Sequence, residues 1–275
     1  MHRSPAAVKR PISDERQNAF RELFRQQSDR MWNADKDVDW DLGVQIPEHK
    51  REAWLRMMNV FYGLELMGLD TIQVMMSKAT HKLRDPNLNL YLAAQTHDEA
   101  RHVYVLGRYL DMSDGWGRMS RVEQVMIDRF SNMAAWGLFR VENWLTSTLF
   151  SENFAALFLQ KALEIEDTDP LAKQIFRNIL RDEVRHVNFL HMSLPDLIGR
   201  LPRLGRAYIW QSQLLLVGAI SIGLRRLHGD AETLGLDIDD FKRTLIDNLD
   251  QQFRDAGLDE VLHAKSYERI INTFV

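Results

Sequence analysis

The sequence contains the motif Asp-Glu-x-Arg-His twice, with the two copies 84 residues apart. Within each copy the Glu and the His are three residues apart, at Glu99 and His102 and again at Glu183 and His186. On a helix this spacing places both side chains on one face. That face is otherwise mainly apolar, and a Glu and a His directed into a core are costly unless they are paired or bind a metal ion. The motif therefore indicates metal chemistry.

The two copies belong to a longer repeat. Each begins with Asp-Pro, at Asp85-Pro86 and Asp169-Pro170, thirteen residues before its motif. Asp followed by Pro is typical of a helix start. A repeated helix predicts packing about a pseudo-two-fold axis, which brings two equivalent sets of side chains to one point. A Glu-x-x-His from each of two helices, with one Glu from each of two others, forms a dinuclear carboxylate site.

The first of the two single carboxylates is easily located. Between Trp54 and Met76 the apolar residues recur at spacings of three and four, which predicts a helix with one apolar face. Glu65 is the only acidic residue on that face. We therefore expect Glu65 to reach the site.

The second single carboxylate has two candidates, Glu142 and Glu152, which differ by ten residues and face the same way. Glu152 and Glu183 are each about fifteen residues from the turn at 167–169, so an antiparallel hairpin places them level. Glu142 would lie about 15 Å further along the axis. We predict that Glu142 is a buried partner of an Arg or part of a pocket wall. The predicted metal ligands are Glu65, Glu99, His102, Glu152, Glu183 and His186.

The Asp of each motif copy precedes a predicted ligand. A metal-bound His usually donates its other N–H to a carboxylate, which fixes its tautomer. In a two-fold arrangement each Asp would reach the His of the other copy, pairing Asp182 with His102 and Asp98 with His186. The Arg residues of the motif are expected to form salt bridges with these acids rather than to contact a substrate; they are Arg101 and Arg185.

The elements that position these residues are all predicted to be helices. Strand-like alternation is absent, and Pro and Gly are scarce inside the periodic segments. We predict an all-α fold, with a four-helix bundle core at about 47–192 and additional N- and C-terminal helices. A flexible arm is expected at 1–12 and one domain at 13–275. The expected helices span 13–32, 47–79, 85–112, 120–166 (continuous or broken), 169–191, 203–227, 238–255 and 258–270. A three-residue offset in the repeat also predicts a π-bulge near Glu152.

Composition excludes several classes of function. The 275 residues include 35 Lys and Arg against 39 Asp and Glu, which gives no electrostatic footprint for nucleic acid or an anionic membrane. The absence of Cys excludes disulfides, thiolate catalysis and iron–sulfur clusters. The longest apolar stretch, Ala207 to Leu224, is interrupted by polar residues and is predicted to be a buried helix rather than a membrane span. We expect a cytoplasmic protein.

This pattern resembles the ferritin-like di-iron carboxylate proteins, and among them the ribonucleotide reductase small-subunit-like oxidases and oxygenases. The six predicted ligands match the family's motif position by position. The segment from Trp32 to His49 also resembles the one that precedes the first ligand helix in reductase small subunits. The resemblance implies that Trp32 hydrogen-bonds Asp182 and carries electrons toward His102 and the metal.

Two positions differ from the related families. Reductase small subunits usually have a radical-forming Tyr four residues after the first ligand His, where this chain has Leu106. Arylamine N-oxygenases are similar in their Asp-Glu-x-Arg-His pattern and in the Glu99 to Glu152 spacing. They carry a third His four residues before the second motif's Glu, where this chain has Ile179.

The resemblance implies an O₂-activating dinuclear iron oxidase or monooxygenase that acts on a small organic substrate. Two Fe ions are expected, with an Mn/Fe pair as the alternative, because carboxylate-rich sites suit these metals. The expected partners are O₂, the substrate, an external electron donor and a second copy of the chain in a homodimer. The alternative functions are a radical-generating small subunit of the ribonucleotide reductase type and a ferroxidase or iron-storage protein.

Overall fold

The computed structural model describes residues 14–83, 86–135, 140–165 and 167–274, so the arm predicted at 1–12 lies outside the described residues. Across these ranges the fold is all-helical and has no strand, as predicted. In chain order the elements are α1 (Asp14–Arg30), η1 (Trp40–Leu42), η2 (Glu48–Lys50), α2 (Arg51–Leu83), α3 (Pro86–Met112), α4 (Arg121–Ala135), α5 (Val141–Glu164), α6 (Pro170–Gly199), α7 (Arg203–Leu234), α8 (Ile238–Asp255) and α9 (Ala264–Phe274).

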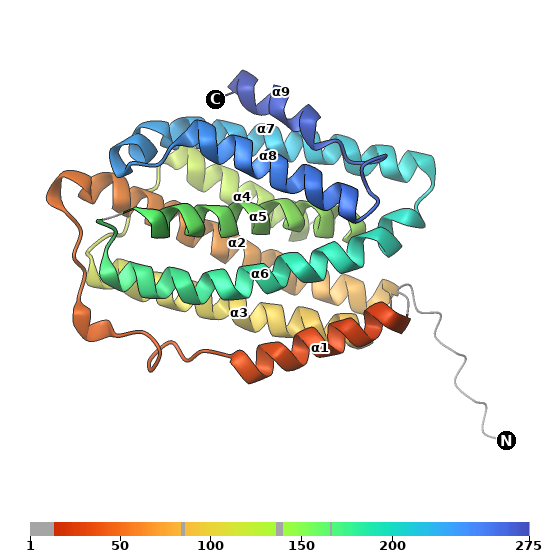
Figure 1. The fold of residues 1–275 in the computed structure, drawn as a ribbon, viewed down its shortest axis with the longest axis horizontal. Helices are drawn as coiled ribbons and strands as arrows, with labels where there is room; N and C mark the ends of the chain where they lie inside the picture. The colour runs from red at the N-terminus through yellow and green to blue at the C-terminus, as the bar shows by residue number, and fades with distance from the viewer. Residues whose placement is uncertain (1–13, 84–85, 136–139, 166, 275) are drawn as a thin grey trace.

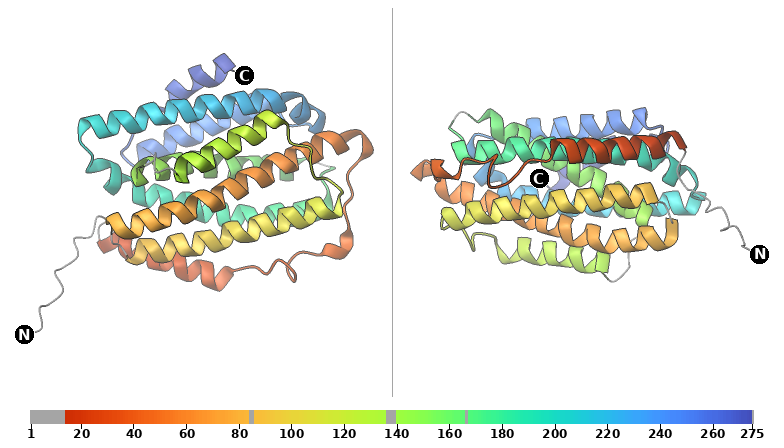
Figure 2. Two further views of the ribbon diagram at one scale, coloured as in Figure 1. Left: turned by 180° about the vertical axis from the view of Figure 1, so that it is seen from behind. Right: turned by 90° about the horizontal axis from the view of Figure 1, so that it is seen from below.

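Four long helices, α2, α3, α5 and α6, form the central bundle (Figure 1). Two antiparallel hairpins build it, because α2 packs on α3 and α5 packs on α6. On one side α1 lies along α3 and α6, and on the other α7 and α8 cover α2 and α5, with α9 outermost. The view from behind shows α4 beside α2 (Figure 2). The two repeated motifs therefore lie on α3 and α6, one in each hairpin.

Local sequence signals account for several helix ends. At the start of α4, the Ser120 amide donates to Glu123 at 2.7 Å and the Glu123 amide donates back to the Ser120 hydroxyl at 3.4 Å. This is the reciprocal capping box that the sequence predicts. At the start of α6, Asp169 accepts from the Ala172 amide at 2.9 Å, with Pro170 at the first helical position. Gly235 ends α7 with a φ of +85°, a conformation that suits glycine.

Several predicted features are wrong. The helix expected at 203–227 continues to Leu234, and the helix expected from 258 begins at Ala264. The helix expected to end near residue 191 continues to Gly199, through Pro195. Buried Leu194 and Leu197 on either side of this proline pack into the core, and tertiary packing of this kind can outweigh the loss of one helical hydrogen bond. The π-bulge expected near Glu152 is not found, because α5 is regular α-helix from Val141 to Glu164.

The prediction for the apolar stretch in α7 is only partly confirmed. Its most apolar window is 28% buried, and by length and composition alone α7 could cross a membrane. One such helix is weak evidence, because core helices pass the same test. Two of the polar interruptions face inward: Gln213 and Ser221 are buried and hydrogen-bonded, while Gln211 is exposed and Leu215 is 78% exposed. The pattern of side-chain polarity on α7 is thus partly inverted.

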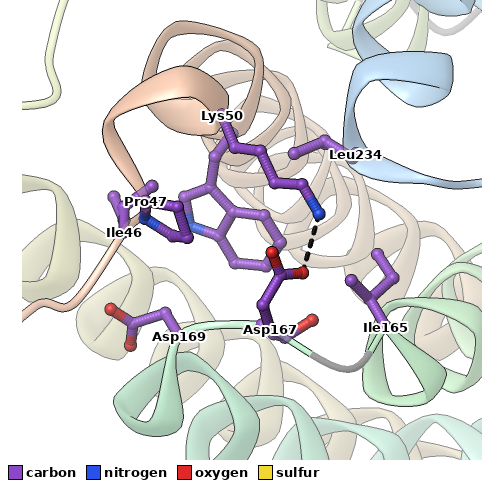
Figure 3. A pocket seen from close by; sticks show the side chains of 9 residues that line it. Ile46, Pro47, Lys50, Ile165, Asp167, Asp169 and Leu234 are labelled. Atoms are coloured by element: carbon purple, nitrogen blue, oxygen red, sulfur yellow. Dashed lines mark hydrogen bonds and ion pairs between the residues drawn. The ribbon is translucent and has the colours of Figure 1, made fainter.

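One end of the bundle is closed by contacts between the two hairpins. Lys50 at the start of α2 forms an ion pair with Asp167 at 2.7 Å, in the connection between α5 and α6 (Figure 3). Ile46, Pro47 and Leu234 lie around this pair and enclose a hollow of about 10 Å³. That volume holds about one water molecule, so we assign no ligand to it.

Candidate metal centre

The structure brings all six predicted ligands together in the middle of the bundle. They form two clusters, Glu65 with His102 and Glu183, and Glu99 with Glu152 and His186. Within each cluster the possible ligand atoms all lie within 4.8 Å of one another, and all six residues are buried. Each cluster takes residues from both hairpins. The centre therefore depends on the assembled bundle rather than on one helix.

Each histidine directs its Nδ1 atom at carboxylates. His102 Nδ1 lies 3.2 Å from Glu65 Oε2 and 3.3 Å from Glu183 Oε1. His186 Nδ1 lies 3.4 Å from Glu152 Oε2 and 3.5 Å from Glu99 Oε1. Carboxylate oxygens and a ring nitrogen that converge in this way make a three-residue donor set for a divalent ion.

Unsatisfied buried atoms show that this donor set fits a metal. Neither carboxylate oxygen of Glu183, which is 1% exposed, has a hydrogen bond within the described residues, and the same holds for His186 Nδ1. A buried carboxylate without a partner is strongly unfavourable. A cation bound between these atoms would supply the missing interaction.

The aspartates pair with the histidines in the crossed manner that the sequence predicts. His102 Nε2 lies 3.2 Å from Asp182 Oδ2, and His186 Nε2 lies 3.4 Å from Asp98 Oδ2. Each contact joins α3 to α6. An N–H donated from Nε2 to Asp leaves a lone pair on Nδ1, so the tautomer that could bind a metal is favoured.

Two arginines complete a buried charge network. Arg101 donates to Asp98 at 2.6 Å and to Asp182 at 2.7 Å, while Arg185 donates to Asp98 at 2.5 Å and to Asp182 at 2.8 Å. The prediction that these arginines hold the acids is confirmed. Two positive and two negative side chains balance, which makes their burial tolerable.

Trp32 closes this network on the outside. Its indole Nε1 donates to Asp182 at 2.8 Å, as the resemblance implies. The Arg101 guanidinium lies 4.6 Å from the centre of the Trp32 ring. Gln27 on α1 donates to Asp98 at 3.1 Å, an interaction that no motif or spacing predicted. Every acid of the network thus has partners from at least two other elements.

Electrostatics separate the aspartates from the glutamates. Burial raises the pKa of Asp182, but His102 and the two arginines lower it more, so the pKa lies far below its ordinary value. Burial and the neighbouring charge of Glu152 raise the pKa of both Glu99 and Glu183 well above the ordinary range. Burial also raises the pKa of Glu152, but its contacts with Glu183 and His186 lower it more, so its net pKa lies below the ordinary value. The aspartates are thus held ionised by fixed cations, whereas Glu99 and Glu183 lack a fixed cation of their own.

The structure distinguishes Glu152 from Glu142. Glu152 belongs to a cluster, and the Gln95 amide donates to its Oε1 at 2.9 Å. Glu142 lies in the first turn of α5, lines no part of the centre, and faces Arg140 at 3.4 Å. The predicted Arg partner is present, but the pair is not buried, because Arg140 is 53% exposed and Glu142 18%. Gln95 was missed, although its place one turn before Glu99 on the same face was a usable signal.

A cavity of about 630 Å³ adjoins the centre on the side away from Trp32. Its wall includes Glu65, Gln95, Glu99, Glu152 and Glu183. It extends between α2, α5 and the covering helices α4, α7 and α8. Small-molecule sites commonly have volumes of about 300–1,000 Å³, so this cavity is large enough for an organic ligand beside the clusters.

Comparison with known proteins now identifies the family. Residues 48–239, more than half of the chain, match the family model of the p-aminobenzoate N-oxygenase AurF. The chain belongs to the AurF family. No curated protein matches it by sequence.

Solved structures show the same fold for this AurF-family member. Two variants of an R2-like ligand-binding oxidase, each with a reconstituted Mn/Fe cofactor, align over 96% of this chain and 100% of their own. Their TM-scores are 0.56 and 0.55, with 18% and 16% sequence identity. The predicted ferritin-like all-α fold is confirmed.

Membership of the AurF family also confirms the predicted class of enzyme, a non-haem dinuclear iron oxidoreductase that is an oxygenase or oxidase. The two positions at which the sequence differs from related families are both buried apolar sites in this chain. Leu106 and Ile179 are each 0% exposed. Neither supplies a further ligand or a phenol near the clusters.

Proposed function

We propose that this protein is an O₂-dependent oxygenase in which Glu65, His102 and Glu183 bind one iron ion and Glu99, Glu152 and His186 bind the other. The observation that carries the proposal is the pair of buried three-residue clusters, in which ligand atoms lack hydrogen bonds. Carboxylate and imidazole ligands suit iron and manganese. An Mn/Fe pair is therefore the alternative cofactor.

The two ions, when bound, supply the electrons and the Lewis acidity that O₂ activation needs. Transfer of one oxygen atom to an organic substrate leaves the other as water and consumes two electrons and two protons. An external electron donor is therefore part of the proposal. The substrate is expected to occupy the cavity that adjoins Glu65 and Glu99.

The chain's own residues keep the centre ready for metal. Asp98 and Asp182 accept from the Nε2 atoms of the two histidines, so each Nδ1 faces the carboxylates with a free lone pair. Arg101 and Arg185 keep these aspartates ionised. The bundle excludes bulk water from the clusters, which limits side reactions with water.

A radical-generating subunit is the second candidate, and one observation favours it. Trp32, Asp182 and His102 form a continuous hydrogen-bonded chain from α1 to the first cluster. Such a chain could carry electrons from a partner protein. Leu106 at the position of the radical-forming Tyr opposes this reading, so the oxygenase proposal is preferred.

Anaerobic titration with ferrous iron, followed by mixing with O₂, tests the proposal. We expect about two irons per chain and a transient visible absorbance that depends on O₂. Zinc-loaded protein is the control and should show no such change. Iron at one or fewer per chain, or no O₂ consumption by the ferrous protein, would contradict the proposal. A stable radical seen by paramagnetic resonance in place of product formation would favour the second candidate.

Two further expectations from the sequence stay predictions. The chain is expected to form a homodimer, which light scattering of purified protein can test. A cytoplasmic location is expected as well, and fractionation of cells that express the untagged chain can test it.

A further inference from the structure

The cavity beside the metal centre is almost entirely apolar. Side chains from seven helices, α2 to α8, line it. Most are aliphatic, aromatic or Met residues, and representative ones are Met57, Phe61, Met126, Phe130, Phe158 and Leu216. Its remaining polar groups are mainly Ser and Thr hydroxyls, at Thr71, Ser147, Thr148, Ser151 and Ser212, and the Tyr208 phenol. Such a wall favours ligands that bury apolar surface.

The described lining of this cavity contains no Lys, Arg or His. Apart from the glutamates of the metal clusters, its only acidic residue is Glu123. Arg56 lies behind Glu123 and donates to it at 2.7 Å, but Arg56 is also paired with Asp230 at 2.9 Å. Arg226 adds a weaker contact with Glu123 at 3.7 Å. These arginines already have carboxylate partners, so a bound anion would find no available cation along the cavity.

With two divalent ions bound, the metal centre would offer no surplus positive charge. The four glutamates would balance the two ions, and the charges of the arginines and aspartates behind the histidines cancel. A carboxylate in the cavity would therefore be buried without a counter-charge, which is strongly unfavourable. The charge balance favours a neutral ligand.

Gly68 opens the cavity toward the reacting centre. It lies on α2 three residues after Glu65, and a Cβ atom at this position would come within 3.3 Å of Glu99 Oε2. Glycine inside a helix costs roughly 1 kcal/mol relative to alanine. Its presence here keeps space directly beside a predicted metal ligand, so an apolar ligand can reach the centre.

We propose that the substrate of this oxygenase is a neutral, predominantly apolar molecule, and that the chain excludes carboxylate substrates such as the p-aminobenzoate for which the AurF family is named. The inference rests on the proposed function only in calling this ligand a substrate. Binding to the cavity can be measured without turnover.

Calorimetric titration of the Mn(II)-loaded protein with three probes tests the proposal: 1-decanol, decanoate and p-aminobenzoate. At pH 7.5 we expect decanol to bind at least about tenfold more tightly than decanoate, and p-aminobenzoate not to bind. A tenfold difference corresponds to about 1.4 kcal/mol. Decanoate binding should strengthen as the pH falls toward the pKa of the free acid, while decanol binding reports any change in the protein itself. Equal or tighter binding of either anion at pH 7.5, or no binding of decanol, would overturn the proposal.

A matched pair of variants on α7 places the ligand in the cavity. Gly223 lines the cavity and Gly229 does not, and a Cβ at either position would meet no atom within 4 Å. Gly223→Leu should weaken decanol binding by about tenfold or more, because the new side chain fills part of the site. Gly229→Leu should leave binding unchanged. If both variants bind decanol like the parent, the ligand lies elsewhere and the proposal fails.

Iron uptake and O₂ reactivity are measured on metal-free aliquots of the same protein preparations, which separates the two proposals. A chain that binds two irons and reacts with O₂ but prefers decanoate keeps its proposed function and loses this inference. A chain that binds decanol in the cavity but takes up no iron loses its proposed function, while the neutral-ligand specificity of the cavity stands.

Discussion

The metal centre has two faces that differ in almost every physical property. On one face, behind the histidine Nε2 atoms, charged residues fill the space and each has partners: Asp98, Asp182, Arg101 and Arg185. On the other face, Glu65 and Glu99 border an apolar cavity of about 630 Å³. A charge network in which every acid and every arginine has partners is rigid and specific. On the cavity side, by contrast, the carboxylates adjoin open space that metal ions and an organic ligand can occupy.

Different helices close the two faces. Gln27 on α1 and Trp32 just after it bond to the aspartates of the filled face. The open face is covered by α4, α7 and α8, whose side chains contribute most of the apolar wall. We infer that the two faces have different roles. The face beside α1 orients the metal ligands and transfers electrons, and the face beside α7 admits the substrate. Variants on each face should therefore fail in different ways.

Substitution of a metal ligand is expected to have the largest effect on metal content and O₂ reactivity, because the ligands lie between the two faces. Glu152→Ala should reduce metal content below two ions per chain and abolish the O₂-dependent absorbance, because one donor of a three-residue cluster is lost. Metal analysis and stopped-flow absorbance measure this directly. Glu142→Gln is the control on the same helix and should retain two metals, since Glu142 faces Arg140 instead. The reverse pattern would show that the assignment of the ligands is wrong.

On the filled face, Asp182→Ala should weaken metal binding by about 10–100-fold. The substitution removes the acceptor for His102 Nε2 and leaves Arg101 with one fewer carboxylate. Competition with a chromogenic chelator gives the affinity. Asp98→Ala should have a similar effect through His186, because the two pairs are related by the repeat. An unchanged affinity in both variants would show that the crossed pairs do not orient the histidines.

Trp32→Phe should separate charge transfer from metal binding. Phe keeps most of the ring but cannot donate to Asp182, which still has Arg101 and Arg185 as partners. We expect two metals per chain and a loss of stability of roughly 1.5–3 kcal/mol, the range for a hydrogen bond to a charged group. Reduction of the oxidised centre by an external donor should be slower. Unchanged reduction kinetics would assign Trp32 a purely structural role.

The positions of the metal-centre residues could be predicted from the sequence because the repeat presents the same motif, with the same spacing, twice. Two copies of Asp-Glu-x-Arg-His defined four ligands and both crossed pairs. Helical rise then selected Glu152 over Glu142, since 1.5 Å per residue over ten residues is a large axial difference. The filled face was predictable because motif spacing determines which groups meet.

The open face could not be predicted in the same way. The cavity arises where α4, α7 and α8 cover the bundle, and no local spacing specifies the gap that they leave. Gln213 on α7 is buried because Ser147 on α5 accepts from it at 3.0 Å, a contact that periodicity cannot reveal. Pro195 predicts a helix end that packing overrides. Tertiary context decides each of these features.

The smallest expected effect concerns Glu123, the acid of the open face that belongs to no metal cluster. It is 4% exposed, accepts from the Ser120 amide and pairs with Arg56 at 2.7 Å. Burial raises its pKa, but the bonds from Ser120 and Arg56 lower it more, so the net pKa lies below its ordinary value. A group with a lowered pKa in the folded state stabilises the protein above its unfolded-state pKa of about 4.3.

Glu123→Gln should therefore cost about 1 kcal/mol of unfolding free energy at pH 7, within the range for a capping interaction. The difference from the parent should shrink as the pH falls through the lowered pKa of Glu123, because the parent's carboxylate then gains a proton. Urea unfolding across this pH range measures it. Glu52→Gln is the matched control: Glu52 also pairs with an arginine at 2.7 Å, but its side chain is 74% exposed, so the loss should be near zero. Equal losses at the two positions would mean that burial beside the cavity adds nothing to the pair.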